Sequence, residues 1–352
     1  FPTTTYLYWG MTDGGQTNGG WANGINLGVR GAGLFTTNLY GLLANQTYYY
    51  RVYATNAQWF HWARSTTNFT TPSPTLQFAL TNSSGSEASS PVNFQLTLSA
   101  TSAVNVTVQY GVSGGTASGG GVDYTLTNGT LTINAGSVTG NVSMAVASDA
   151  LDESDETVTV AISNATMAAL GSNSNHTYTI IDDDPTPIVA FVGAPYVVME
   201  DGTNRVVTVS ISAGSGRNVT VDYGTADGTA TNGLDYTNCI GTLTWTPGET
   251  GSKTFSVPII NDILEEADET IIVGLSNAVN ADISASNTTI TIIDNDGPPK
   301  VLFSGEPFSV AENATDAVVT LVINATAEAT VTVEYITWAG TATSGNDFTN
   351  RS

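Results

Sequence analysis

A repeat of 112 residues governs most of this 352-residue chain. The segment Gly121–Tyr124 recurs at Gly233–Tyr236 and again at Gly345–Phe348, each time 112 residues later. The run Ile180–Asp184 returns at Ile292–Asp296 with the same spacing. Solenoid repeats have periods of roughly 20 to 50 residues, whereas about 110 residues suffice for a small domain. The sequence therefore predicts tandem domains and not a solenoid.

Each repeat consists of short segments in which apolar and polar side chains alternate. Val104–Tyr110, Val219–Tyr223 and Thr157–Ile162 are examples, and Gly, Asn and Asp separate such segments. Alternation with a period of two predicts half-buried strands, and no segment has a clear amphipathic-helix pattern. We therefore expect an all-β protein of tandem antiparallel immunoglobulin-like β-sandwiches. The short proline-containing links at 185–187 and 297–299 favour an elongated rod.

Charge divides the chain into two parts near 71–74. The whole chain carries 31 acids and 8 bases, for a net charge of −23, yet residues 1–72 hold only one of those acids and three of the bases. An acidic protein is a poor partner for nucleic acid or for anionic lipid, because both require basic surfaces. The balance suits cation binding. Cys239 is the single cysteine, so no intrachain disulfide forms, and no apolar run is long enough to span a membrane.

Carboxylates gather at three places in each of the first two repeats. If loops at one end of a sandwich bring these places together, their mutual repulsion requires a counter-ion. Calcium takes six to eight oxygen ligands in a tolerant geometry, and the side chains available here are oxygen donors. His61, His176 and Cys239 lie apart from the acids, which argues against zinc. The alternative is a solvated acidic rim that keeps the protein soluble. The carboxylate runs are Asp123, 149–156 and 182–184, then Asp235, 262–269 and 294–296.

Together, the early Glu, the Gly-x-Asp-Tyr motif, the acid run and the closing Ile-Ile-Asp-x-Asp resemble the Calx-β domain, the family named for the sodium–calcium exchanger. The resemblance covers 75–184 and 188–296 fully and 300–352 in its N-terminal half. It implies Ca²⁺ as the cofactor. Asn295, Asn261 and Ser148 depart from the family's acids, so fewer or weaker ions are expected. The implied ligands are Glu87, Asp123, Asp149, Glu153, Glu156, Asp182, Asp183 and Asp184 in the first domain, and Glu200, Asp235, Asp262, Glu266, Glu269, Asp294 and Asp296 in the second.

Residues 1–72 resemble part of a fibronectin type III domain. The segment Leu42–Asn56 is similar to the region of that family's sixth strand, and Tyr48 would be its corner tyrosine, whose hydroxyl bonds back to the backbone. Tyr6–Gly10 is similar to a middle strand, while the first two strands of the fold are missing. The aromatic run Trp59–Trp62 has two interpretations: a platform for sugar rings or a partner, or side chains packed within the domain.

The third repeat breaks off after Asp347-Phe348, and the chain opens at Phe1-Pro2 without a start methionine. One hypothesis is that the sequence is a window on a longer chain. The other is that neighbouring molecules complete the broken domains, as in strand-complemented fibres.

The resulting expectation is a non-enzymatic structural or adhesive protein. It would be a calcium-stiffened string of sandwiches in an extracellular filament or a bacterial cell-surface adhesin, and would self-associate or continue in a longer chain. The alternatives are a calcium-responsive regulatory or binding module, and a carbohydrate-binding accessory region of a larger protein. A surface glycan or protein ligand is a further expected partner, whereas nucleic acid is not.

Overall fold

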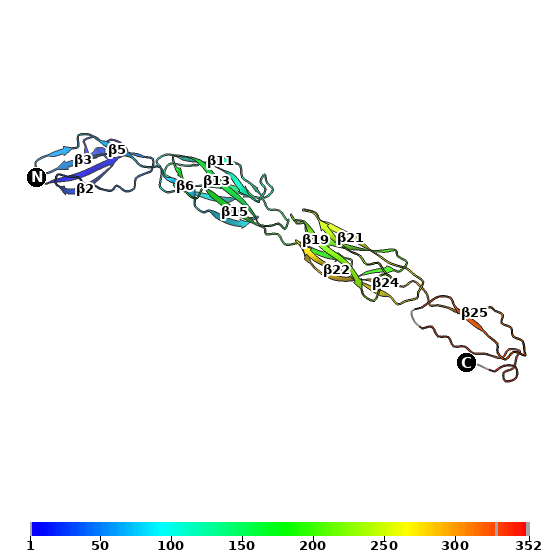
Figure 1. Cartoon of the computed structure of the whole chain (residues 1–352). Coiled ribbons are helices and arrows are strands. Elements are labelled where there is room, and N and C mark those ends of the chain that lie inside the picture. The colour runs from blue at the N-terminus through cyan, green and yellow to red at the C-terminus, as the bar shows by residue number, and fades with distance from the viewer. Residues whose placement is uncertain (1, 328–329, 350–352) are drawn as a thin grey trace. The chain divides into compact units, whose positions relative to one another are not determined.

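The computed structural model describes residues 2–327 and 330–349 (Figure 1). Residues 328–329 and 350–352, which belong to the predicted third domain, lie outside the described residues. The described residues form strands, with one short 3₁₀ turn at Asn18–Gly20 and no α-helix. They divide into two compact units, 1–149 with 154–183, and 150–153 with 184–352. The expected all-β fold of tandem immunoglobulin-like sandwiches is confirmed.

The first unit begins with a single five-stranded sheet. Its strands run in the order β2-β1-β3-β4, and β5 also pairs with β3. The Tyr48 hydroxyl accepts a hydrogen bond of 3.0 Å from the backbone amide of Leu43, the kind of bond that a corner tyrosine makes. The wider resemblance to fibronectin type III stays a prediction. The strands are β1 (Thr3–Gly10), β2 (Asn23–Arg30), β3 (Thr47–Thr55), β4 (Phe60–Trp62) and β5 (Thr67–Thr70).

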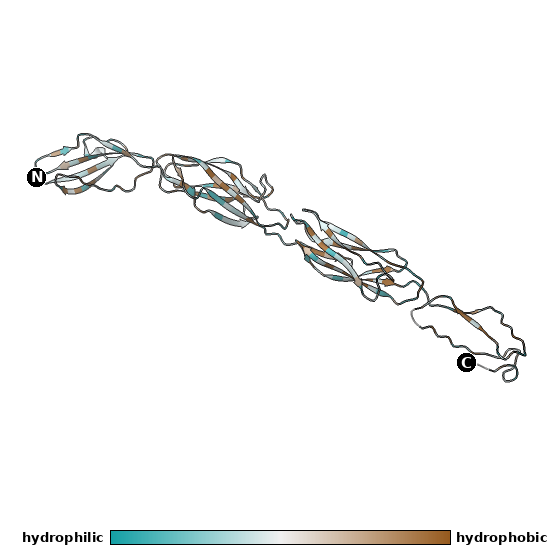
Figure 2. Cartoon of the chain, in the orientation of Figure 1, coloured by the Kyte–Doolittle hydropathy of each residue, from teal (hydrophilic) through white to brown (hydrophobic). Residues whose placement is uncertain are grey.

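The rest of the first unit is a sandwich of two five-stranded sheets with the orders β10-β12-β8-β6-β14 and β11-β9-β13-β15-β7. Alternate residues of both sheets point inward and form one core, with Phe78, Phe94 and Leu96 almost fully buried. Figure 2 shows hydrophobic and hydrophilic residues interspersed along these strands. The strands are β6 (Thr75–Phe78), β7 (Asn82–Ser86), β8 (Val92–Leu98), β9 (Val106–Gly115), β10 (Tyr124–Thr125), β11 (Gly129–Ile133), β12 (Thr139–Val146), β13 (Glu156–Thr166), β14 (Ala169–Leu170) and β15 (Asn175–Ile181).

The second unit contains an equivalent sandwich, with sheets ordered β21-β18-β16-β23 and β17-β24-β22-β19-β20. Its core surrounds Trp245 and Tyr236. The indole of Trp245 is 1% exposed and donates a hydrogen bond of 3.0 Å to the carbonyl of Gly251. The strands are β16 (Ile188–Val192), β17 (Tyr196–Met199), β18 (Asn204–Ile211), β19 (Val219–Asp227), β20 (Ile240–Trp245), β21 (Gly251–Pro258), β22 (Glu269–Val279), β23 (Asp282–Ile283) and β24 (Asn287–Ile293).

The sequence repeat is visible in local backbone geometry. Asn164 and Asn277 lie near the ends of β13 and β22 and adopt positive φ values of 49° and 50°. Asparagine tolerates this left-handed conformation better than most residues do. Each side-chain amide donates a hydrogen bond to the adjoining strand, Asn164 to Gln109 at 2.6 Å and Asn277 to Asp222 at 3.1 Å. The two sandwiches thus share a β-bulge as well as a strand order.

The C-terminal part of the second unit has a two-stranded antiparallel sheet, β25 (Val301–Ser304) with β26 (Thr320–Ile323). Its apolar residues are largely exposed. No helix among the described residues is long and apolar enough to cross a membrane.

Candidate metal centres

One candidate centre lies where two parallel strands of the second sandwich end side by side. Strand β17 pairs in parallel with β24, so that Met199 faces Ile293. Glu200 follows the first strand and Asp294 follows the second, and the Glu200 amide donates a hydrogen bond of 2.9 Å to the Ile293 carbonyl. With Asp296 these residues form a group whose carboxylate oxygens lie within 4.8 Å of one another. Strand pairing therefore brings together acids that are far apart in the sequence.

The Glu200 carboxylate is buried, with only 6% of the residue exposed. Its Oε1 accepts a hydrogen bond of 3.0 Å from the Asp262 amide, while its Oε2 has no hydrogen-bond partner among the described residues. Asp296 Oδ2 is likewise buried and has no hydrogen-bond partner among the described residues. Burial, and then the nearby carboxylates of Asp262, Asp294 and Asp296, raise the pKa of Glu200. Buried, unpartnered carboxylate oxygens are costly, and a cation removes that cost.

A second group in the same sandwich consists of Asp235, Glu266 and Glu269. Asp235 lies in the turn after β19, where its Oδ2 accepts a hydrogen bond of 2.6 Å from the Thr231 amide. Glu269 begins β22 and Glu266 lies in the loop before it. These three acids and two from the first group, Glu200 and Asp294, line a cavity of about 10 Å³. That volume is close to the size of one small bound species, so the two groups are neighbours around one hollow.

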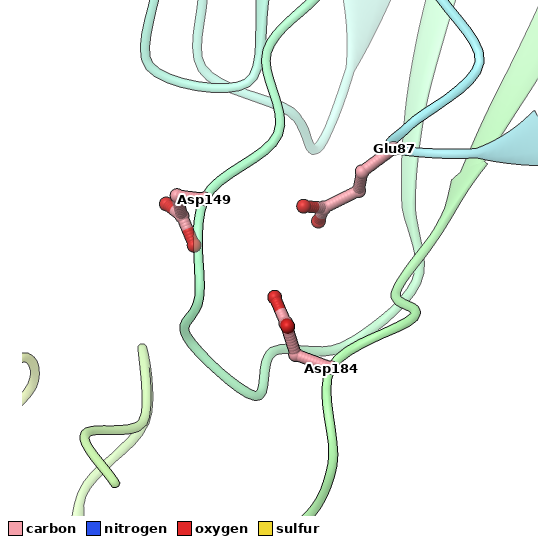
Figure 3. A group of neighbouring side chains, drawn as sticks. All are labelled: Glu87, Asp149 and Asp184. Carbon is pink, nitrogen blue, oxygen red and sulfur yellow. The ribbon is translucent and has the colours of Figure 1, made fainter.

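Figure 3 shows a third group, Glu87, Asp149 and Asp184, whose carboxylates point into a common space. In the repeat, Glu87 and Asp184 correspond to Glu200 and Asp296, whereas Asp149 corresponds to Asp262. The strand arrangement is repeated here, because β7 pairs in parallel with β15 and the Glu87 amide donates a hydrogen bond of 3.1 Å to the Ile181 carbonyl. Glu87, like Glu200, is buried. The parallel strand pair is thus a feature of both complete sandwiches.

The other predicted ligands lie outside these three groups in the described structure. Asp123 and Asp183 accept hydrogen bonds from the Ser118 amide and the Ser86 hydroxyl. The Asp182 amide donates a hydrogen bond of 3.2 Å to Asp155 Oδ1. The Oδ1 of Asp182 itself is buried without a hydrogen-bond partner among the described residues.

Three further predicted ligands also lie apart from the groups. Asp262 supports Glu200 through its backbone amide. Glu153 lies against Gly216, whose Cβ, if present, would be 2.1 Å from Glu153 Oε1. Glu156 is the first residue of β13.

Sequence reasoning missed the role of Asp152. This residue is 4% exposed and belongs to the second unit, where its Oδ2 forms an ion pair of 2.5 Å with Arg217 and accepts a hydrogen bond of 3.1 Å from the Ser215 hydroxyl. The sequence does not reveal this ion pair, because nothing in the acid run 149–156 distinguishes Asp152 from the other acids. The available signal was Arg217 itself, one of only eight basic residues.

Comparison with known proteins identifies the family of the chain. The Calx-beta domain model matches residues 71–184, 182–296 and 294–352. The chain belongs to the Calx-beta domain family. Residues 1–70 lie outside the match.

The family's relatives include sodium/calcium exchangers. Sodium/calcium exchanger 1 of Rattus norvegicus is 32% identical over 188 residues, which are 48% of this chain and 19% of the exchanger. Sodium/calcium exchanger 2 of the same species is 30% identical over 182 residues, 47% of this chain and 20% of the exchanger. The alignments thus span about a fifth of the length of these relatives.

Among solved structures, the apo form of the Calx CBD1 domain is 28% identical, with a TM-score of 0.31, and the match covers 32% of this chain and all of that one. A structure named calcium binding domain CBD12 of CALX1.1 is 19% identical, with a TM-score of 0.32, and the match covers 62% of this chain and 99% of that one.

These relatives correct one expectation from the sequence. The predicted extracellular, cell-surface location is wrong, because the matching curated proteins are sodium/calcium exchangers. The prediction rested on β-sandwich composition and on the adhesive role inferred with it. Neither feature carries physical information about a compartment, since cores and ion sites of this kind do not depend on disulfides or on an oxidising environment.

Proposed function

We propose that this chain is a calcium-binding module with cation sites in both complete Calx-beta domains. The observation that carries the proposal is the pair of buried oxygens, Glu200 Oε2 and Asp296 Oδ2, that lack a hydrogen-bond partner among the described residues. The groups Glu200, Asp294, Asp296 and Asp235, Glu266, Glu269 serve the second domain, and Glu87, Asp149 and Asp184 serve the first.

The donor set favours calcium over other common metals. Each group consists of carboxylates alone, which suits a hard cation and excludes the nitrogen or sulfur ligands of structural zinc sites. Asp262, Asp123, Asp182 and Asp183 are neighbouring acids that supply further oxygens in this proposal. Calcium accommodates such an irregular set, whereas magnesium demands near-octahedral geometry and releases its waters reluctantly.

The ion would act on stability. A cation between Glu200 and Asp294 joins the ends of β17 and β24 and removes the repulsion among the buried acids. Because it binds the folded domain and not the unfolded chain, it stabilises the fold by mass action. Nothing in this role requires catalysis, and we expect no enzymatic activity.

Of the roles predicted from the sequence, the calcium-responsive binding module has the most support, because the family model covers both carboxylate-bearing domains and a sodium/calcium exchanger is 32% identical over 48% of this chain. The structural or adhesive role, with self-association into a fibre or continuation in a longer chain, gains no support from the comparisons. If the chain is part of a longer protein, we propose that calcium binding by this module regulates an effector domain attached to it.

The test is calcium-linked stability measured on the full chain. Thermal unfolding in EDTA and in calcium should differ, with calcium raising the midpoint. The double variant Glu200→Gln, Asp296→Asn should lose the part of this rise that comes from the second domain, because the first domain keeps its own carboxylate group. Asp282→Asn should keep the whole rise, since Asp282 lies outside the carboxylate groups. A midpoint in calcium equal to that in EDTA for the unsubstituted chain would contradict the proposal.

A further inference from the structure

Five aromatic side chains lie on one face of the N-terminal sheet. Register places Tyr6 opposite Tyr53 and Tyr53 opposite Trp62, so that a row of rings crosses β1, β3 and β4. Tyr8 and Phe60 extend this row, and neighbouring ring centroids are 4.8 to 6.4 Å apart. We call these five residues the aromatic face.

The segment 35–42 lies against the opposite side of the sheet, whereas the aromatic face is partly exposed. Leu7, Tyr50 and Val52 alternate with the aromatic residues along their strands and line a cavity with the segment 35–42. On the aromatic face, Phe60 is 66% exposed and the adjoining Trp59 is 49% exposed. Tyr6, Tyr8 and Tyr53 are half-buried and Trp62 is buried against them, so Phe60 and the edges of the tyrosine rings form the accessible part of this face. Accessible apolar rings with polar edges are a candidate binding surface.

The rings combine apolar surfaces with free polar rims. No hydrogen bond joins the hydroxyls of Tyr6, Tyr8 or Tyr53 to another described residue. Burial, and then its neighbours Tyr6 and Tyr53, raise the pKa of Tyr8, so that its hydroxyl stays protonated at neutral pH. The Tyr8 ring packs directly on Gly24 of the neighbouring strand β2, where a Cβ would lie only 2.7 Å from the ring. The surface therefore offers π-faces bordered by hydroxyl donors and acceptors.

The charge of the surrounding residues limits the chemical class of ligand that this face can bind. None of the five residues of the aromatic face is charged. Arg51, which lies opposite Tyr8 on the same side of the sheet, donates hydrogen bonds to the carbonyls of Ala63 and Arg64 at 2.9 and 3.0 Å. A nucleic acid strand would also stack on rings, but its phosphates require a row of basic side chains, and Arg51 already donates its hydrogen bonds to backbone carbonyls. The negative π-face instead complements polarised C–H groups. A pyranose presents such C–H groups on its flat face and hydroxyls around its rim.

We infer that the aromatic face binds neutral glycan chains of pyranose rings. One sugar ring stacks on the exposed Phe60, and neighbouring rings lie along Tyr53, Tyr6 and Tyr8 with their hydroxyls bonded to the tyrosine hydroxyls. This activity is independent of the carboxylate groups and requires no calcium.

Native gels cast with a defined polysaccharide test the inference on the full chain, using laminarin, hydroxyethyl cellulose and galactomannan as neutral probes and alginate as the acidic one. At least one neutral polysaccharide should retard the chain equally in calcium and in EDTA. Phe60→Ala should weaken the association constant about tenfold, comparable to the loss of one stacked ring. The double variant Tyr6→Phe, Tyr53→Phe should weaken it several-fold with the rings retained.

Tyr40→Ala is the matched control, because Tyr40 is 81% exposed and belongs to the segment on the opposite side of the sheet. It should bind as the unsubstituted chain does. Absence of retardation by all three neutral probes, retardation by alginate alone, or equal binding by the Phe60→Ala and Tyr40→Ala variants would overturn the inference. None of these results bears on calcium binding.

Discussion

The buried carboxylate of Glu200 accepts a hydrogen bond of 3.0 Å from the backbone amide of Asp262, 62 residues along the chain. This bond ties the end of β17 to the loop that precedes β22. It satisfies one oxygen of Glu200, while the other has no hydrogen-bond partner among the described residues. The carboxylate is therefore held in position while one of its oxygens remains available to bind a cation.

Glu200→Gln should have opposite effects with and without calcium. Without the ion, the neutral amide removes a buried charge, so the second domain should become slightly more stable. With calcium a hundredfold above its Kd, the unsubstituted domain gains about 2.7 kcal/mol and the variant should gain much less. Urea unfolding in calcium and in EDTA, monitored by the hydrogen exchange of peptides from β22 and β24, measures both effects. Lower stability of the variant in EDTA would contradict this prediction.

The raised pKa of Glu200 predicts a pH dependence for the calcium-free protein. The folded state holds the proton more tightly than the unfolded chain, whose Glu has a pKa of about 4.5. Stability from this group is therefore present at low pH and is lost as pH rises from that value through the raised pKa. Hydrogen exchange of the β24 peptide in EDTA, measured across this range, reports the loss. The Glu200→Gln variant is the control and should lack this component.

Adjacent glycines at the end of β9 should respond differently to alanine. Gly115 has a φ of 125°, and a Cβ there would lie 2.1 Å from the Thr157 carbonyl oxygen. Gly115→Ala should thus destabilise the first sandwich by about 2 kcal/mol or more. At Gly114 a Cβ meets nothing within 4 Å, so Gly114→Ala should change stability by less than about 1 kcal/mol. Equal urea midpoints for the two variants would argue against this backbone geometry.

Trp245→Ala should destabilise the second sandwich by about 3 to 5 kcal/mol, because it removes the largest fully buried side chain and its hydrogen bond to Gly251. Exchange should accelerate in peptides from β20 and β22 and stay unchanged in peptides from β9 and β13, which belong to the other unit. The Tyr40→Ala variant, which changes an exposed aromatic residue, is the control for aromatic loss alone.

The 112-residue repeat and the two-residue alternation sufficed to predict the sandwiches, because both patterns follow from how strands bury one face. The carboxylate groups were only partly predictable. Glu200 and Asp294 come together through the parallel pairing of β17 with β24, and a parallel pair leaves no turn signal in the sequence. Asp152 was indistinguishable from its acidic neighbours until its contact with Arg217 was known. Register and long-range pairing, not composition, separate the acids that gather from those that do not.

Calcium binding itself is the most direct test, measured by isothermal titration of the EDTA-stripped full chain. The account predicts saturable calcium uptake that falls in the Glu200→Gln, Asp296→Asn variant and is kept in the Asp282→Asn variant. Absence of uptake by the unsubstituted chain, or equal uptake by all three proteins, would contradict it.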